Sequence, residues 1–376
     1  MKFIVSRDEI YRNLSIVSGV LSSNNVMPIL DNFLFTIVGE TLTVTASDLD
    51  TTMSAVINLS NAEGEGSVAV PSKILLATLK DLPSTPIVFA IDEETQDMTF
   101  TAGEGLYDTP CFNGSEFPQI KSIENPSFFD ISASVLQRAI SKTIFATGND
   151  ELRPNMMGVL CELSSEYIAF VATDAHKLVR YRNNSIKTDD FVSFILPKKP
   201  LAQLKNALSN SNENVHVEYS ADTHHVQFTF ANITLFSSLK EGKYPNYEAV
   251  IPKENPNIFT TPCEDFLKTM KRVGNFSNKS TFQVRMILNE ELVKVKAEDL
   301  DFSNKAEESV NGKYNGTAMD IGFNSKFLCE MLDNMDSEEI RLEMSVPNRA
   351  ALILPSEEFD ATESLLMLIM PVMLND

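Results

Sequence analysis

The sequence contains only four cysteines, and none of them forms a Cys-x-x-Cys pair. Cys111, Cys161, Cys263 and Cys329 are scattered through 376 residues, which argues against a zinc site and against a disulfide framework. The chain also lacks a run of about 18 apolar residues that could span a membrane, and its start lacks the basic and apolar segments of a secretory signal. We therefore expect a cytoplasmic protein that holds no metal and no cofactor.

Basic residues are in the minority. The chain has 31 lysines and arginines against 52 acidic residues, which gives a net charge of −21 at pH 7. A protein that binds nucleic acid normally carries a basic footprint, so this balance argues against such a partner unless the cations gather on one surface. With 43% hydrophobic residues the chain is a folded protein that can bury more than one core.

The chain does contain a long internal repeat. The tract Gly114–Pro126 returns loosely as Gly242–Pro256, with an aromatic residue and proline followed by Glu-Asn-Pro in both copies. Short segments that end at Asp48, Asp174 and Asp299 recur at the same phase. A repeat of about 125 residues is the size of a whole domain rather than of a solenoid unit. We therefore predict three tandem domains of one fold, over residues 1–126, 127–255 and 256–376.

Each repeat is predicted to contain two rounds of a strand, a helix and further strands. Ser6 begins a capping-box pattern, so the first helix is expected to run to about Leu21. Phe33–Val38 and Thr41–Thr45 alternate as strands. Two helices on one face of an antiparallel sheet make an α+β domain. The other helices are expected near Pro71–Leu82, Ser134–Thr147, Pro197–Leu208 and Asn324–Met335, with one more after a second capping box at Thr261.

The basic residues gather on these expected helices. Four of the six carry a net positive charge although the whole chain is acidic. Arg138 and Lys142 are four residues apart, and Lys268, Lys271 and Arg272 also share one helical face. Lysine is common on any solvated helix, so mere solvation is the alternative interpretation.

Several segments match a known family in their order and spacing: Met1–Phe3, Met27–Leu30, Ala172–Leu178, Gly242–Tyr247, Gly322–Asn324 and Met370–Leu374. On these segments the chain resembles, over its whole length, the bacterial β sliding clamp, the processivity subunit of DNA polymerase III. The resemblance implies a homodimeric ring that is not an enzyme. Its helices would line a hole around duplex DNA, and it would tether the polymerase and other replication and repair proteins.

Such a ring needs cations only on its inner wall, because phosphate contacts carry no sequence information. Ser22–Asn25 and Pro154–Asn155 also fall where the family touches DNA, but Asn24, Pro154 and Asn155 replace an arginine and tyrosines of the family. The candidates for DNA-facing residues are Lys73, Lys80, Arg138, Lys142, Arg153, Lys198, Lys199, Lys205, Lys268, Lys271 and Arg272.

The resemblance also implies a pocket between the second and third domains for a short linear peptide from polymerases, the clamp loader and repair proteins. Ala175, Ala249 and Met373 replace a glycine and two arginines of the family, so the preferred neighbours of the peptide's anchors are expected to differ. The expected lining is Met156, Thr173, Ala175, His176, Lys177, Leu178, Pro245, Val250, Leu368, Met370, Pro371, Val372, Met373 and Leu374.

The dimer interface is implied to join Tyr107 and Thr109, on an edge strand of the first domain, to Asn275 and Phe276 of the other chain. Strand addition there would hide sheet edges that otherwise promote aggregation. Ile74 stands in place of a family lysine near this interface, so the electrostatics of the interface need not be shared.

Two other classes of function are compatible with the composition. The first is an acidic three-domain scaffold that binds only proteins, and it would be indicated if any DNA that the protein retains were held without regard to the topology of the DNA. For an enzyme, His176 beside Asp174 is the most suggestive pair, but no nucleophile stands at a known spacing from it, which favours a structural or pocket-lining histidine. His224 and His225 lack further ligands at metal-binding spacing.

Overall fold

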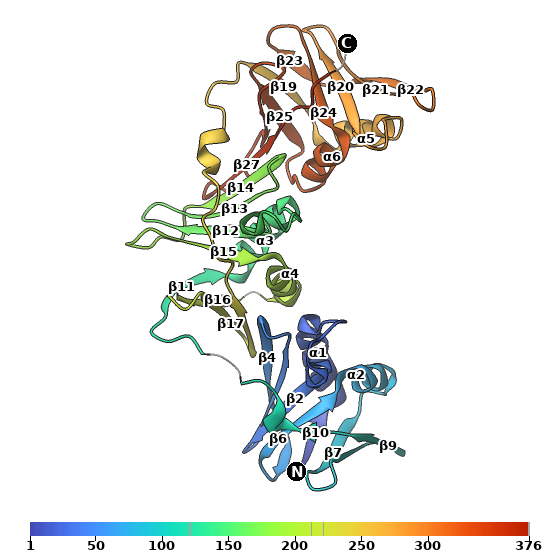
Figure 1. Cartoon of the computed structure of the whole chain (residues 1–376), viewed down its shortest axis with the longest axis vertical. Helices are drawn as coiled ribbons and strands as arrows, with labels where there is room; N and C mark the ends of the chain where they lie inside the picture. The colour runs from blue at the N-terminus through green and yellow to red at the C-terminus, as the bar shows by residue number, and fades with distance from the viewer. Residues whose placement is uncertain (120–121, 212, 221, 375–376) are drawn as a thin grey trace. The chain divides into compact units, whose positions relative to one another are not determined.

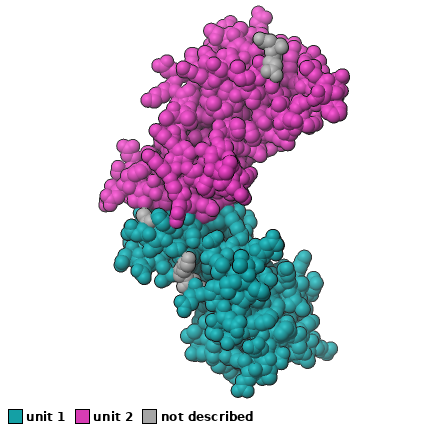
Figure 2. All heavy atoms as spheres, viewed as in Figure 1, with its two compact units in different colours: residues 1–137, 199–239 teal, residues 138–198, 240–376 magenta. Residues whose placement is uncertain are grey.

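The computed structural model describes residues 1–119, 122–211, 213–220 and 222–374. Ile120 and Lys121 of the repeated tract, and Asn375 and Asp376 at the end, lie outside the described residues. The chain forms two compact units, which we call unit 1 (residues 1–137 and 199–239) and unit 2 (residues 138–198 and 240–376) (Figure 2). Each unit contains two antiparallel sheets.

Unit 1 contains a five-stranded sheet A and a nine-stranded sheet B. In spatial order, sheet A consists of β5 (Asn61–Glu63), β1 (Lys2–Ser6), β7 (Pro86–Asp92), β8 (Asp97–Ala102) and β9 (Gly105–Pro110). Sheet B consists of β10 (Phe112–Asn113), β6 (Gly66–Pro71), β2 (Asn32–Val38), β3 (Thr41–Ser47), β4 (Thr51–Asn58), β18 (Ile233–Ser238), β17 (His225–Phe230), β16 (Asn214–Ser220) and β11 (Ser127–Ser132).

Helices α1 (Arg7–Val17) and α2 (Ser72–Asp81) lie side by side in unit 1 (Figure 1). An aromatic cluster forms part of the core of this unit. Phe3 stacks on Phe89 with their ring centroids 4.8 Å apart, and Phe35 meets both rings edge-on. Helix α4 (Lys198–Ala207) buries Pro200, Leu201 and Leu204, and α1 and α2 likewise bury one apolar face each.

Unit 2 contains a nine-stranded sheet C and a four-stranded sheet D. Sheet C consists of β15 (Val192–Pro197), β12 (Gly158–Leu163), β13 (Ile168–Thr173), β14 (Lys177–Asn183), β27 (Glu363–Ile369), β26 (Ala351–Pro355), β25 (Glu339–Met344), β19 (Asn257–Pro262) and β23 (Lys313–Asn315). Sheet D consists of β22 (Asn304–Val310), β21 (Val293–Asp299), β20 (Gln283–Leu288) and β24 (Met319–Asn324).

Helices α5 (Cys263–Gly274) and α6 (Ser325–Asp333) pack against each other in unit 2 (Figure 1), and α3 covers Ala133–Thr143. The α+β prediction is confirmed. No helix in the described part of the chain is both long and apolar enough to cross a membrane. The first helix is shorter than predicted, because the chain tightens into a 3₁₀ turn at Ser18–Val20; α3 ends in the same way at Ile144–Ala146.

The predicted capping boxes are wrong. In the described part of the chain no backbone amide of α1 donates a capping hydrogen bond to the Ser6 side chain, and α5 is preceded by Pro262 rather than capped by Thr261. Thr261 is buried and donates to the Asn311 carbonyl instead, at 2.6 Å. A true cap occurs at α6, where Asn324 Oδ1 accepts from the backbone amides of Lys326 and Phe327.

The recurring aspartates act as turn formers. Asp48 Oδ1 accepts hydrogen bonds from the amides of Asp50 and Thr51, and Asp174 Oδ1 accepts from His176 and Lys177 in the same way. Asp299 Oδ1 accepts from the amide of Asp301. Asp48 and Asp174 directly follow strands and Asp299 is the last residue of one, so the repeat reflects local turn chemistry rather than a catalytic carboxylate pair.

Candidate functional site

The expected peptide site begins at the turn between β13 and β14. Thr173 Oγ1 donates to the Lys177 carbonyl at 2.7 Å, which closes the turn. Ala175 has φ of +76°, a left-handed conformation that a glycine would adopt without strain. The turn leaves Ala175 and His176 exposed at its tip. The imidazole of His176 stacks on Phe327 of α6, with ring centroids 5.8 Å apart.

The C-terminal tail runs beside this turn. The Met370 amide donates to the His176 carbonyl, and the Val372 amide donates to the Gly322 carbonyl, both at 2.9 Å. A Cβ at Gly322 would lie 2.6 Å from the Val372 carbonyl oxygen and 2.8 Å from Leu374 Cδ2, so this glycine is needed for the tail to approach β24. Met370 and Met373 remain 40% and 77% exposed, which gives the site an open apolar surface.

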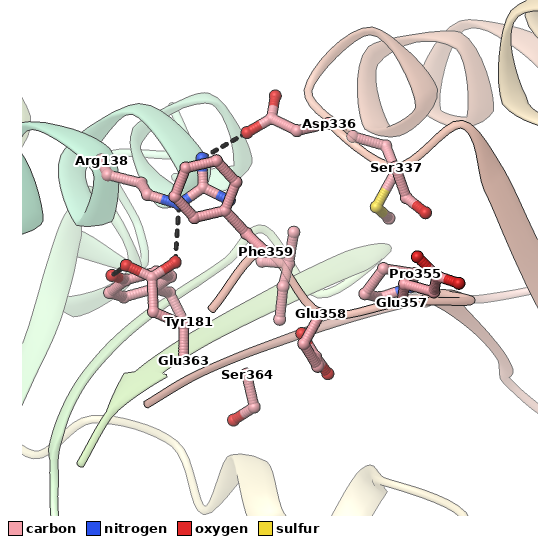
Figure 3. A pocket seen from close by; sticks show the side chains of 12 residues that line it. Arg138, Tyr181, Asp336, Ser337, Pro355, Glu357, Glu358, Phe359, Glu363 and Ser364 are labelled. Carbon is pink, nitrogen blue, oxygen red and sulfur yellow. Dashed lines mark hydrogen bonds and ion pairs between the residues drawn. The ribbon is translucent and has the colours of Figure 1, made fainter. Parts of the chain in front are cut away.

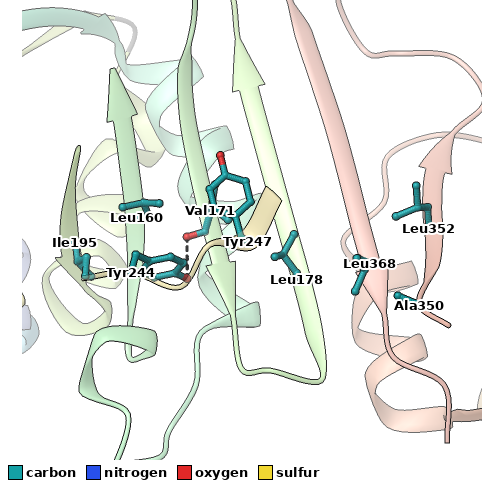
Figure 4. Close-up of a cluster of buried hydrophobic side chains, with 9 residues drawn as sticks. All are labelled: Leu160, Val171, Leu178, Ile195, Tyr244, Tyr247, Ala350, Leu352 and Leu368. Carbon is teal, nitrogen blue, oxygen red and sulfur yellow. Dashed lines mark hydrogen bonds between the residues drawn. The ribbon is translucent and has the colours of Figure 1, made fainter. Parts of the chain in front are cut away.

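A buried cluster supports the site from below (Figure 4). Leu178 and Leu368 are register partners across the β14–β27 pair, and both are 2% exposed. Tyr244 contacts the start of the turn, because its hydroxyl accepts a hydrogen bond from the backbone amide of Thr173 at 3.1 Å. Burial raises the pKa of Tyr244. The whole cluster is Leu160, Val171, Leu178, Ile195, Tyr244, Tyr247, Ala350, Leu352 and Leu368.

Most predicted pocket residues are therefore brought together, but in different roles. Three of them are buried beneath the surface of the site: Thr173, Leu178 and Leu368. Five others are exposed at the surface: Ala175, His176, Val250, Met370 and Met373. Met156 ends a 3₁₀ turn (Pro154–Met156) that is bound to the Gly242–Pro245 segment, because the side-chain Nδ2 of Asn155 donates to the Lys243 carbonyl at 2.7 Å. Pro245, Pro371, Val372 and Leu374 are partly buried. The sequence did not reveal the roles of Phe327, Gly322 and Tyr244, although the Gly-Phe-Asn motif stands just before Phe327.

Lys177 departs from the prediction of an accessible lining residue. Its side chain is only 6% exposed. The ammonium lies 2.9 Å from Asp174 Oδ2 and 2.9 Å from Glu330 Oε2, and 4.5 Å from the centroid of the Phe327 ring. The lysine thus joins the turn to α6 and does not present its charge to a ligand.

The basic residues of α2 and α4 meet the prediction of a polar helix face in unit 1. Lys73 and Lys80 are exposed, and Lys205 is partly exposed. Lys199 forms an ion pair with Asp48 and donates to the Val20 carbonyl at 3.3 Å. At the start of α4, Lys198 belongs to unit 2 and lies 3.5 Å from Asn149 Oδ1.

In unit 2 the exposed cations of the predicted DNA-facing set form ion pairs with nearby acids. Arg153 pairs with Asp150 at 2.9 Å, and the α5 residues Lys268, Lys271 and Arg272 pair with Glu264, Asp333 and Glu308 at 2.6 to 2.8 Å. Exposed ion pairs contribute little in water, so these side chains can exchange a carboxylate for a phosphate at small cost.

Arg138 and Lys142 require a correction, because both lie in a partly buried network of charges; Figure 3 shows Arg138 with its two acidic partners. Arg138 Nε donates to Glu363 at 2.7 Å, its guanidinium also pairs with Asp336, and the Phe359 ring lies over it at 3.9 Å. The Lys142 ammonium lies 2.6 Å from Asp336 Oδ1, and burial lowers its pKa. With side chains 19% and 7% exposed, these two residues are not part of an exposed DNA-facing row.

The same network involves Tyr181 of β14, whose hydroxyl donates to Glu363 at 2.5 Å. Burial, followed by this hydrogen bond to a carboxylate, raises the pKa of Tyr181. The network therefore ties α3 and β14 to the start of β27 and to the segment after α6. Among the described residues, no three histidine, cysteine or acidic side chains are grouped so that they could hold a metal ion.

The expected interface residues lie at sheet edges or near them. Tyr107 and Thr109 are on β9, which has no partner strand on its outer side among the described residues. Leu106 of the same strand is 64% exposed. Asn275 and Phe276 follow α5, and Phe276 is 44% exposed. Strand β22 is the corresponding free edge of sheet D in the described chain.

Removal of residues 372–376 is expected to weaken binding of a polymerase-derived peptide at least tenfold. Burial of one leucine or phenylalanine side chain contributes about 1.5–3 kcal/mol, and the tail would supply part of the apolar wall of the expected peptide site. Calorimetry with the peptide measures this loss, and thermal melting provides the control. If binding is lost while the melting temperature is unchanged, the tail forms part of an exposed binding surface. If the melting temperature falls sharply, the tail is instead a strand of the core.

Comparison with known proteins gives one consistent family. The models of the DNA polymerase III beta subunit match residues 1–121 with the N-terminal domain, 130–246 with the central domain and 248–372 with the C-terminal domain. The beta sliding clamps of Pseudomonas aeruginosa and Escherichia coli are 28% and 25% identical over 362 and 374 residues. These alignments cover 96% and 100% of this chain, and 98% and 100% of those proteins.

Solved structures are similar over the full length of the chain. The clamp from Pseudomonas aeruginosa bound to griselimycin has a TM-score of 0.93 at 27% identity, and the clamp from Bartonella birtlesii bound to the same compound has 0.93 at 26%. Each comparison covers 100% of both chains.

Proposed function

The chain belongs to the DNA polymerase III beta subunit family and is a sliding clamp, and from this we propose that two copies close head to tail around duplex DNA. A clamp of this family is a processivity factor and not an enzyme. We propose residues 1–126, 127–255 and 256–376 as its three domains.

The order of the strands carries the ring proposal. Strands β4 and β14 begin at Thr51 and Lys177, one repeat apart, and each pairs with a strand of the following repeat, β18 and β27. One repeat after β14, the strand in the position of β4 and β14 is β22, which begins at Asn304. One repeat before β18, the strand in the position of β18 and β27 is β9, which begins at Gly105. Each of these two strands is the last strand at one edge of its sheet in the described chain, β22 in sheet D and β9 in sheet A.

A second copy would satisfy both edges. Sheet D has four strands and sheet A has five, so pairing of β22 with β9 of another copy would build a further nine-stranded sheet, like sheets B and C. Pairing at the other edge in the same way closes a two-chain ring. Strand pairing is a strong reason to dimerise, because an unpaired edge exposes backbone amides and carbonyls.

The mass in solution tests this assembly. The ring predicts about 84 kDa, twice the 41.8 kDa of one chain, and light scattering after size-exclusion chromatography measures it. A mass of one chain at micromolar concentration would contradict a closed ring.

We further propose that the exposed cations of the helices contact DNA phosphates without reading sequence, and that the tail site takes peptides from polymerases, the clamp loader and repair proteins. The family supports DNA and polymerase as partners. Exposed cations on α2 and α5 support the first contact, and the apolar surface at Met370 and Met373 supports the second. The protein-only scaffold is not favoured.

Charge reversal of Lys73 and Lys80 to glutamate is expected to weaken DNA association and to flatten its salt dependence. The log–log slope should fall by roughly 0.9 for each phosphate contact that is lost. The matched control reverses Lys187 and Lys253, which are exposed on connecting segments away from the helices. Titration of each double variant with DNA at several salt concentrations measures the slope. Equal slopes for the two double variants would show that α2 does not face DNA.

A further inference from the structure

The peptide site carries an excess negative charge at one edge. The Lys177 ammonium pairs there with Asp174, whose other oxygen accepts from two backbone amides. Glu330 is a second carboxylate on the same ammonium, at 2.9 Å. The Glu330 side chain is 51% exposed, whereas the Asp174 side chain is 16% exposed. The uncompensated charge therefore faces solvent on Glu330.

This carboxylate lies beside the apolar surface of the site. Glu330 and Phe327 are three residues apart on α6 and thus share a helical face. The His176 ring stacks on Phe327, and the Met370 amide donates to the His176 carbonyl. A ligand whose apolar side chains contact this surface would bring its neighbouring residues close to Glu330.

Among the described residues, no cation other than Lys177 forms an ion pair with Glu330, although Lys326 precedes it by four residues on α6. The Lys326 ammonium lies over the Phe282 ring, 3.5 Å from its centroid. Arg180 and Arg182 pair with Glu248 at 3.0 and 2.6 Å. Ala249 and Met373 carry no charge at the positions where the resemblance would place arginines.

We propose that Glu330 determines specificity: it favours peptides that carry lysine or arginine next to their apolar anchors and disfavours peptides with an acidic residue there. This inference rests on the proposed peptide-binding function. The attraction acts at a half-exposed position, so it should be modest and should decrease as salt screens it.

The test uses two synthetic peptides from the clamp-binding segment of the cognate polymerase, identical except for lysine or glutamate beside the apolar anchors. Calorimetry at low salt is expected to show about two- to fivefold tighter binding of the lysine peptide. The preference should disappear in Glu330→Gln and persist in Glu330→Asp. Glu290→Gln, an exposed change at the β20–β21 hairpin, is the matched control and should keep the preference.

The outcomes separate this inference from the function beneath it. Equal binding of both peptides to the unchanged protein, or a preference that survives in Glu330→Gln, overturns the role of Glu330 and leaves peptide binding intact. If neither peptide binds, the proposed peptide site is itself wrong. The melting temperatures of the variants verify that loss of the ion pair with Lys177 has not unfolded α6.

Discussion

Leu106→Asp is expected to convert the dimer into a 41.8-kDa monomer and to abolish retention on circular DNA. Leu106 is 64% exposed on β9, the strand that the ring would pair with β22 of the other copy. In that interface the introduced carboxylate would lose water and would face β22, which already contains Glu307 and Glu308. An unpaired charge in a closed interface costs several kcal/mol, enough to shift a dimer to monomers.

Val38→Asp is the matched control for this change. Val38 is 63% exposed, but its strand β2 is paired on both sides, with β3 and β6. The control should keep the mass of the dimer. A Leu106→Asp protein that remains near two chains in light scattering would place the interface elsewhere.

Arg138→Met is expected to lower the free energy of unfolding by about 3–5 kcal/mol. The change removes the guanidinium and leaves Glu363, with an 8% exposed side chain, without its main cation. Breaking a buried ion pair from one side has this large effect because the remaining charge stays in a low-dielectric site. Urea denaturation followed by circular dichroism measures the loss.

Arg153→Met gives the comparison for an exposed pair. Arg153 and Asp150 have side chains 43% and 42% exposed, so this change should cost less than about 1 kcal/mol. The double change Arg138→Met with Glu363→Gln should regain part of the loss, since the stranded charge is then removed. If Arg138→Met and Arg153→Met unfold alike, the network in Figure 3 does not stabilise unit 2.

The sequence predicted the strand and helix order well because the repeat supplies the same pattern three times. The helices α2 and α4 begin and end within one residue of their predicted limits. Caps were predicted less well: Ser6 is the last residue of β1 and its side chain accepts no capping hydrogen bond, and Thr261 donates to the Asn311 carbonyl instead. Helix limits depend on local geometry that residue spacing alone does not determine.

The DNA-facing set shows why tertiary contacts limit such predictions. Arg138 and Lys142 have the i,i+4 spacing of a solvated face, yet their partners Asp336 and Glu363 lie about 200 residues further along the chain. No local pattern could reveal those partners. Lys177 presents the same difficulty, because its burial depends on Glu330 of a helix in another repeat.

The lifetime of the protein on circular DNA tests the ring most directly. After loading onto a nicked circle by the cognate ATP-driven loader, the bound protein is separated from free protein by gel filtration, with and without one restriction cut. The ring predicts slow loss from the intact circle and rapid loss once the circle is linearised, because a ring can slide off an end. Equal loss rates from circular and linear DNA would contradict encirclement.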